Sequence, residues 1–215
     1  MTEREHYIPA FGHRLLTPFY DRFIRLAIRE EKVKRAFLRA ARIESGHKVL
    51  DLGCGTGTLA IMLKQLHPNA QVTGLDGDRG VLEIARKKGA RAGVDIQWEE
   101  GVAYSLPYVG GTFDRVLSTF VFHHMGTPQK MDAIKEVHRV LRAGGEFHLL
   151  DLGKPKGLYA KLVSLLLSRL ERAADHIKGR LPDYVREGGF AEVHEPMFFQ
   201  VLVGTVRGIA GTKPM

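Results

Sequence analysis

The stretch VLDLGCGTGTLA, residues 49–60, joins an apolar run that ends in an acid, three closely spaced glycines and the start of a helical pattern. A strand, a glycine-rich turn and a helix in this order build a nucleotide-binding turn, because glycine lets the backbone approach a ligand closely. Dinucleotide folds space their glycines as G-x-G-x-x-G. Here Gly53, Gly55 and Gly57 follow a G-x-G-x-G spacing, and Thr58 stands where the third glycine is expected. The turn therefore predicts a nucleotide other than a dinucleotide.

Two acidic residues distinguish between the candidate ligands. Asp51 ends the first strand pattern, where its carboxylate would lie close to a pyrophosphate. At an effective dielectric of about 20, like charges roughly 5 Å apart repel by about 3 kcal/mol. Asp76 ends the second strand pattern, where an acid can accept hydrogen bonds from both ribose hydroxyls. The turn thus favours a nucleoside that has no phosphates and carries positive charge, which describes S-adenosylmethionine.

Short apolar runs alternate with helical patterns over the rest of the chain. This alternation predicts βαβ units on a parallel sheet, an α/β fold. We expect strands at residues 48–52, 71–76, 95–100, 113–120 and 145–152, helices at 58–67, 79–90 and 129–141, and a C-terminal hairpin of 191–200 and 202–209. Residues 1–45 read as helices before the sheet, and 157–175 as an amphipathic helix inserted after the fifth strand.

Four segments together resemble the class I S-adenosylmethionine-dependent methyltransferases: VLDLGCGTG, GLDGDRGVLEIARKK, LPYVGGTFDRVLSTFVFHHM and EVHRVLRAGGEFHLLDLGKP. They are most similar to the branch that contains the ubiquinone and menaquinone biosynthesis methylases. The resemblance implies a Rossmann-like, doubly wound seven-stranded sheet of order 3-2-1-4-5-7-6 with strand 7 antiparallel. It also implies one domain, made of an N-terminal helical cap (1–45), a cofactor-binding core (46–153), a helical insert (154–188) and a hairpin (189–215).

The resemblance assigns the cofactor to named positions. The glycine turn with Cys54 would pass under the methionine and ribose parts, Asp51 would lie near the amino group, and Gly77 and Asp78 would lie beside the adenosine. Tyr20, in TPFYD, resembles a tyrosine that closes over the cofactor, although a plain core aromatic fits equally well.

One position departs from the family pattern. Members commonly carry an acid in a GDA triplet that reaches the adenine amino group, whereas this chain has Gly101, Val102 and Ala103. Losing one such hydrogen bond costs about 0.5–1.5 kcal/mol, too little to change the cofactor assignment. Val102 packing, the backbone of Ala103 or a register shift of Glu100 are the alternatives for reading adenine.

Three side chains are candidates for the chemistry. His123 and His124 follow the fourth strand, on the edge where open α/β sheets bind ligands, and one of them could act as a base. The alternative is that they cap the strand. Asp151 ends the fifth strand and could orient the substrate. Adjacent histidines also suggest a metal, but neighbours in a strand point to opposite faces, so no metal site is expected.

Composition limits the location. The 215 residues are 44% hydrophobic and 26% charged, as in ordinary soluble proteins. No apolar run approaches the roughly 18 residues of a membrane span, and the N-terminal segment lacks the apolar core of a signal peptide. One cysteine excludes an intrachain disulfide. These features favour a cytoplasmic protein.

The net charge is +8, and the positive charges concentrate in residues 29–42 and 154–186. Such stretches suit nucleic acid or an anionic membrane, but interleaved acids favour a solvated helix face. No RNA-recognition core or zinc knuckle is present, so no nucleic-acid partner is expected. Residues 158–173 could contact a membrane peripherally or pack on the sheet as a lid.

These observations predict methyl transfer from S-adenosylmethionine, by in-line displacement, to an O, C, N or S centre of a small, apolar acceptor. One alternative is a non-catalytic module that binds the cofactor or its product, S-adenosylhomocysteine. A second is an NAD-dependent oxidoreductase, which the glycine spacing and Asp51 disfavour.

Overall fold

A computed structural model describes residues 30–153, 179–201 and 204–215. Its strands form a seven-stranded sheet of order β3-β2-β1-β4-β5-β7-β6. The strands are β1 (Lys48–Leu52), β2 (Gln71–Asp76), β3 (Gln97–Glu100), β4 (Phe113–Thr119), β5 (Leu141–Leu152), β6 (Ala191–Val201) and β7 (Gly204–Thr212). The first five are parallel, and β7 runs antiparallel to both neighbours. The predicted order and the antiparallel last strand are confirmed.

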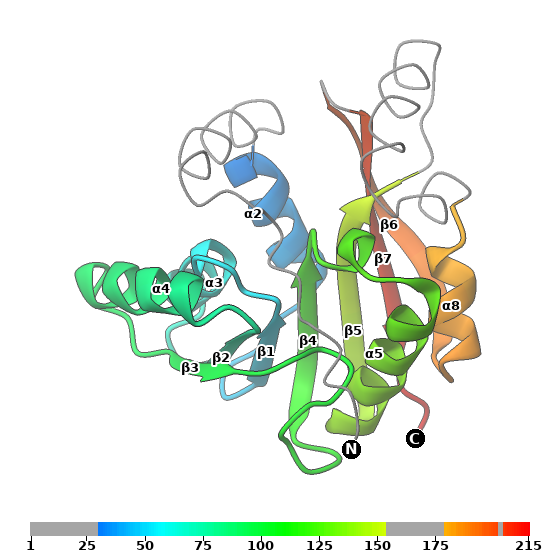
Figure 1. Ribbon diagram of the computed structural model, residues 1–215, viewed down its shortest axis with the longest axis horizontal. Coiled ribbons are helices and arrows are strands. Elements are labelled where there is room, and N and C mark those ends of the chain that lie inside the picture. Colours follow the sequence, from blue (N-terminus) through cyan, green and yellow to red (C-terminus); the bar gives the residue numbers. More distant parts are fainter. Residues whose placement is uncertain (1–29, 154–178, 202–203) are drawn as a thin grey trace, which may run out of the picture.

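The helices cover both faces of this sheet (Figure 1). They are α2 (Glu30–Ala40), α3 (Thr58–Leu66), α4 (Arg79–Arg91), α5 (Thr127–Val140) and α8 (Leu181–Glu187), with a 3-10 turn, η1, at Phe122–His124. One apolar cluster joins α2 and α3 to the sheet, and a second joins α5 and α8 to the other face. Tyr20, the expected helix at 157–175 and the candidate membrane contact at 158–173 lie outside the described residues.

Residue alternation along β1 distributes side chains between the two layers. Val49 packs in the cluster of α2 and α3, whereas Leu50 and Leu52 pack in the cluster of α5 and α8. A parallel strand buried on both faces needs such a nearly continuous apolar run. Asp51 shares the face of Val49, because side chains alternate along a strand, and this directs its carboxylate toward α3.

The start of β5 differs from expectation. It begins at Leu141, directly after α5, and not at Gly145. The strand passes a register shift opposite Phe113 and Arg115 of β4, and Gly144 adopts a positive φ there. This irregular start explains why period-two alternation does not predict a strand at residues 141–144.

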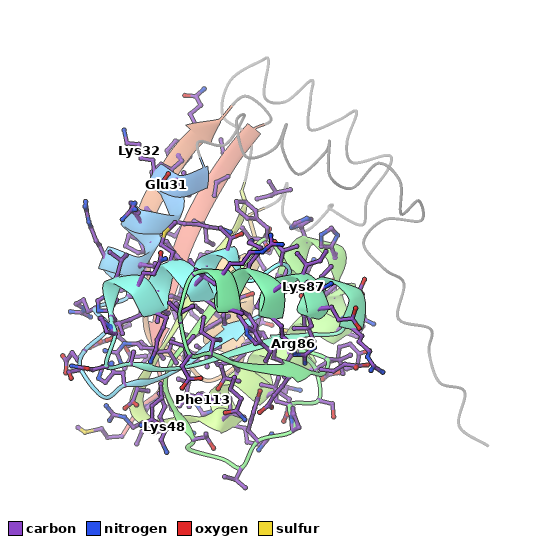
Figure 2. All side chains as sticks on the ribbon, turned by 90° about the vertical axis from the view of Figure 1, so that its left-hand side faces the viewer. Glu31, Lys32, Lys48, Arg86, Lys87 and Phe113 are labelled. Carbon is purple, nitrogen blue, oxygen red and sulfur yellow. The ribbon has the colours of Figure 1, made fainter. Side chains whose placement is uncertain are left out.

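Exposed basic residues lie on α2, which belongs to the basic stretch 29–42, and also on α4. Figure 2 shows Lys32 on α2 and Arg86 and Lys87 on α4. All three side chains are exposed, and Arg35 of α2 pairs with Glu31 at 3.0 Å. Interleaved charge of this kind fits a solvated helix face.

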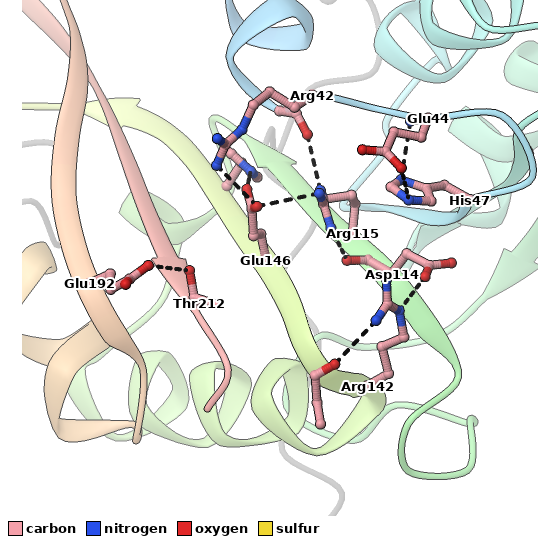
Figure 3. A network of polar contacts seen from close by, with 12 residues as sticks. Arg42, Glu44, His47, Asp114, Arg115, Arg142, Glu146, Glu192 and Thr212 are labelled. Carbon is pink, nitrogen blue, oxygen red and sulfur yellow. Dashed lines mark hydrogen bonds and ion pairs between the residues drawn. The ribbon is translucent and has the colours of Figure 1, made fainter. Parts of the chain in front are cut away.

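A polar network ties the end of α2 to β4 and β5 (Figure 3). Glu146 is held by Arg42 at 3.2 Å, Arg115 at 3.3 Å and His148 at 2.8 Å. Arg115 also donates from Nε to the carbonyl of Ala41 at 3.0 Å. The hydrogen bond from His148, together with the two guanidinium charges, lowers the pKa of Glu146 to about 2. The network therefore stabilises the fold mainly through the ionised form of Glu146.

We expect Glu146→Gln to lower the free energy of unfolding at neutral pH by about 3 kcal/mol, because the buried guanidinium of Arg115 loses its counter-charge. The folded pKa lies below the unfolded value, so this contribution is present above about pH 4.5 and is lost as the pH falls toward 2. Urea unfolding from about pH 3 to 7 should give a flatter pH dependence for the variant. Glu31→Gln, in an exposed pair, is the control; equal pH curves for Glu146→Gln and wild type would contradict the assignment.

Candidate functional site

The glycine turn connects β1 to α3. Gly53, Gly55 and Gly57 have φ values of 70°, 53° and 76°, which L side chains rarely adopt. A Cβ at Gly53 would lie 2.3 Å from Val121 Cγ2, and one at Gly57 would lie 2.5 Å from Trp98 Cη2. No described atom lies within 4 Å of a Cβ built at Gly55. Packing within the protein thus requires the outer two glycines, and the middle one leaves its backbone open to a ligand.

Asp51 lies beneath this turn and is fully buried. Its Oδ2 accepts the amide of Ala60 at 3.1 Å, while Oδ1 has no hydrogen-bond partner in the described part of the chain. Burial raises the pKa of Asp51 to about 7, against the opposing charge of Lys34. A carboxylate oxygen without a donor, next to an open glycine backbone, fits an ammonium group such as that of S-adenosylmethionine.

Asp76 holds the turn from the end of β2. Its Oδ2 accepts the Gly55 amide at 2.8 Å, and its Oδ1 accepts the Asp78 amide at 3.0 Å. Burial raises the pKa of Asp76, and these two hydrogen bonds oppose the shift. Each carboxylate oxygen has two lone pairs, so the predicted ribose contact fits alongside them. Asp78 lies beside Asp76, but its side chain caps α4 by accepting the Gly80 amide at 2.7 Å.

Lys88 of α4 is a contact that sequence patterns did not suggest. Its Nζ donates to Thr58 Oγ1 at 2.8 Å and to Thr56 Oγ1 at 3.2 Å. Thr58, which replaces the expected third glycine, therefore ties the turn to α4 through its hydroxyl. The lysine and this threonine are 30 residues apart, so no local spacing links them.

The segment that follows β3 lies next to Asp76. The Gly101 amide donates to the Asp76 carbonyl at 3.0 Å, and Ser105 donates to the Val102 carbonyl at 3.2 Å. Ala103 is buried, Val102 is half-buried, and Glu100 is exposed opposite Asp76 in the sheet register. Gly101 to Ala103 therefore follow directly after the end of β3, beside Asp76, and Glu100 is the acid next to them. That any of these residues contacts adenine stays a prediction.

Helix α5 fixes the chain that continues from this segment. Glu136 accepts the Leu106 amide at 2.7 Å, and Arg139 donates to the Tyr108 carbonyl at 2.7 Å. These bonds hold the loop that follows Gly101, although this loop contains no regular strand. They thereby help to position its backbone beside the end of β2.

His123 and Asp151 form a buried pair at the carboxyl ends of β4 and β5. His123 Nδ1 lies 2.8 Å from Asp151 Oδ1, and Asp151 Oδ2 accepts the Phe122 amide at 2.8 Å. The Leu152 amide adds a bond to Oδ1 at 2.7 Å. The sequence suggested both residues separately, and their pairing appears only in the fold.

The turn after β4 corrects the reason given against a metal. His123 and His124 lie in η1 and not in a strand, and their ring centroids are 3.9 Å apart instead of on opposite faces. Among the described residues, no group of three or more metal-ligating side chains is found. No helix in the described ranges is long and apolar enough to cross a membrane.

Phe120 brings the two halves of the site together. It has a φ of 59°, which is rare for a residue other than glycine. Its amide donates to the Leu150 carbonyl at 2.9 Å as the chain leaves β4. Beyond this corner, Val121 lies against Gly53 and His123 reaches Asp151. The pair of His123 and Asp151 therefore lies close to the glycine turn.

Comparisons with known proteins identify the family of the chain. Residues 49–145 match the family model described as a methyltransferase domain. The chain is 33% identical over 158 residues to a demethylmenaquinone methyltransferase of Thermus thermophilus, covering 72% of this chain and 71% of the relative. It is 31% identical over 201 residues to the ubiquinone/menaquinone biosynthesis C-methyltransferase UbiE of Desulfotalea psychrophila, covering 84% of this chain and 80% of the relative.

A solved structure extends the likeness in fold. The S-adenosylmethionine-dependent methyltransferase SibL, in its apo form, matches with a TM-score of 0.73 at 21% identity. The match covers 97% of this chain and 60% of SibL.

We expect Gly55→Ala to weaken S-adenosylmethionine binding at least about tenfold, because the methyl group would enter the open space where the cofactor approaches the backbone. Gly46 is the matched control, since it also has a positive φ (82°) and no described atom within 4 Å of a built Cβ. Gly46→Ala should carry the same backbone strain and leave the affinity unchanged. Calorimetric titration of both variants decides; equal affinities would place the cofactor elsewhere.

Asp51 predicts a pH dependence of cofactor binding. Its folded pKa of about 7 lies above the usual 3.8, so ionising it costs stability as the pH rises, and a bound ammonium offsets that cost. Affinity for S-adenosylmethionine should therefore fall below pH 7, approaching about tenfold per pH unit. Asp51→Asn should bind more weakly at neutral pH and lose this dependence. A wild-type affinity that stays constant from about pH 5.5 to 7 would contradict the contact.

Proposed function

The chain belongs to the class I S-adenosylmethionine-dependent methyltransferases, and we propose that it methylates a ring carbon of a small quinol-type acceptor. The methyltransferase activity and the methyl donor follow from the family. The proposed acceptor is supported by the names of the relatives above, which are methylases of menaquinone and ubiquinone biosynthesis. The observation that carries the proposal is the buried pair of His123 and Asp151.

The described residues fit the methyl donor. Bound S-adenosylmethionine supplies a methyl group on a positively charged sulfur, which is the electrophile of the reaction. Asp51 offers a buried carboxylate oxygen to the amino group, Gly55 offers open backbone, and Asp76 offers its carboxylate to the ribose. These groups bind and orient the donor, and alignment of the reacting atoms is the main catalytic requirement.

The pair of His123 and Asp151 supplies the base that methylation at carbon needs. A quinol ring carbon becomes a good nucleophile when the neighbouring hydroxyl loses its proton, so a base must take that proton. Asp151 accepts from His123 Nδ1, which selects the tautomer whose Nε2 carries the lone pair. Amides of Phe122 and Leu152 hold the carboxylate in place. We therefore assign His123 as the base and Asp151 as the residue that positions it.

Methylation on oxygen is the second candidate. The same base would remove the proton of a phenol, and the oxygen itself would then attack the methyl group. The non-catalytic binding module is less well supported, because such a module has no need of a positioned histidine. The C- and O-methylated products differ in structure and are separated by NMR.

We expect His123→Gln to lower kcat for a naphthalenediol acceptor by about 10²–10⁴, the usual contribution of a general base. Binding of S-adenosylmethionine should be unchanged. His124→Gln is the matched control and should retain most activity. Full activity of His123→Gln would refute the base assignment.

A further inference from the structure

A small pocket lies beside Asp151, next to the start of α8. Three polar residues line it, Asp151, Glu195 and Arg207, together with apolar side chains that include Leu181 and Ile209. It has room for about one water-sized group. A substituent of an acceptor could enter this pocket, whereas its ring could not.

Arg207 is held across the end of β5. It is the register partner of Asp151 in the β5–β7 ladder, so both side chains lie on the same face of the sheet. Its Nη1 donates to Glu195 Oε2 at 2.9 Å, and the guanidinium lies 5.8 Å from the ring centroid of Phe198. A Cβ at Gly153 would lie 2.6 Å from Arg207 Cγ, so only glycine admits the side chain there.

One donor of this arginine is left over. Arg207 Nε is buried and has no hydrogen-bond partner in the described part of the chain. Leaving a buried donor unpaired costs about 1–3 kcal/mol. A ligand oxygen in the pocket would remove this cost, and the same oxygen would bind more weakly to a protein without the donor.

The charges around the pocket select the kind of oxygen. Glu195 already pairs with the guanidinium, and Asp151 also lines the pocket. Two carboxylates beside a single guanidinium disfavour a further anion such as a carboxylate or phosphate. A neutral hydroxyl or carbonyl oxygen fits, because it accepts a hydrogen bond and adds no charge.

We propose that Arg207 binds, through Nε–H, a second oxygen of the acceptor, while His123 takes the proton from the first. This inference rests on the proposed function and assigns recognition of the second oxygen of the quinol to Arg207. Arg207 is then a specificity-determining residue: it distinguishes a dioxygenated ring from a ring with one hydroxyl. Burial of the unpaired donor makes the monohydroxy compound the weaker ligand.

The test compares binding of 1,4-naphthalenediol and 1-naphthol to the S-adenosylhomocysteine complex, kept anaerobic with a reductant. In the wild type the diol should bind about tenfold more tightly than the naphthol. Arg207→Met should bring this ratio to about one by weakening the diol only. Arg207→Lys, which keeps the charge opposite Glu195 but lacks Nε–H, should lose the discrimination as well and covers the case in which the methionine variant does not fold.

Arg186→Met is the matched control, because Arg186 lies on α8 and pairs with Asp183 at 3.0 Å on the surface. It should keep the wild-type ratio. A wild-type ratio near one, or an equal loss of both ligands in Arg207→Met, overturns the inference and leaves the pocket as a site for a bound water.

Binding to the product complex needs no turnover, so the two proposals can fail separately. A ratio that collapses in Arg207→Met, with no methylation of either compound, would support the oxygen subsite and refute the quinol reaction. Methylation of the diol with an unchanged ratio would do the reverse.

Discussion

The contact between Val121 and Gly53 is the constraint on which the site depends. The glycine turn can receive the valine only because position 53 has no side chain, and the valine reaches it only because Phe120 adopts a positive φ. This corner joins the turn after β1 to the turn after β4. It brings the groups that would hold the methyl donor next to the pair of His123 and Asp151. In-line transfer requires the donor and the acceptor to lie side by side.

Buried carboxylates are distributed unequally along the sheet. At the carboxyl edge, Asp51 and Asp76 both have raised pKa values, because burial outweighs the hydrogen bonds they receive. On β5 the Glu146 carboxylate has a lowered pKa, because it accepts a hydrogen bond from His148 and lies beside the guanidinium groups of Arg115 and Arg42. Ionising Asp51 and Asp76 costs stability, whereas Glu146 stabilises the folded chain. The network around Glu146 thus helps to offset the cost of the two acids at the carboxyl edge.

Several predictions from sequence failed or were incomplete for one shared reason. Thr58 read as a missing glycine, but its hydroxyl meets Lys88 from a distant helix. Asp78 caps the helix that it precedes, a role that the predicted adenosine contact does not include. The two histidines were placed on opposite strand faces, although they occupy a 3-10 turn with facing rings. Each of these roles depends on a partner or a backbone path that residue spacing does not encode.

The sequence by itself determined most of the strands and helices, the glycine turn and the acids at the ends of β1 and β2, because periodicity and turn chemistry are local properties. The sheet order was implied by the resemblance of four segments to a known family, and not by periodicity. The sequence also indicated the donor, since a carboxylate at Asp51 disfavours phosphates. Only the tertiary structure decided that His123 pairs with Asp151 and that Arg207 lies across from that same carboxylate. These contacts join residues that are far apart in the sequence, and the arrangement of strands that brings them together is set by the packing of the whole sheet and not by any one segment.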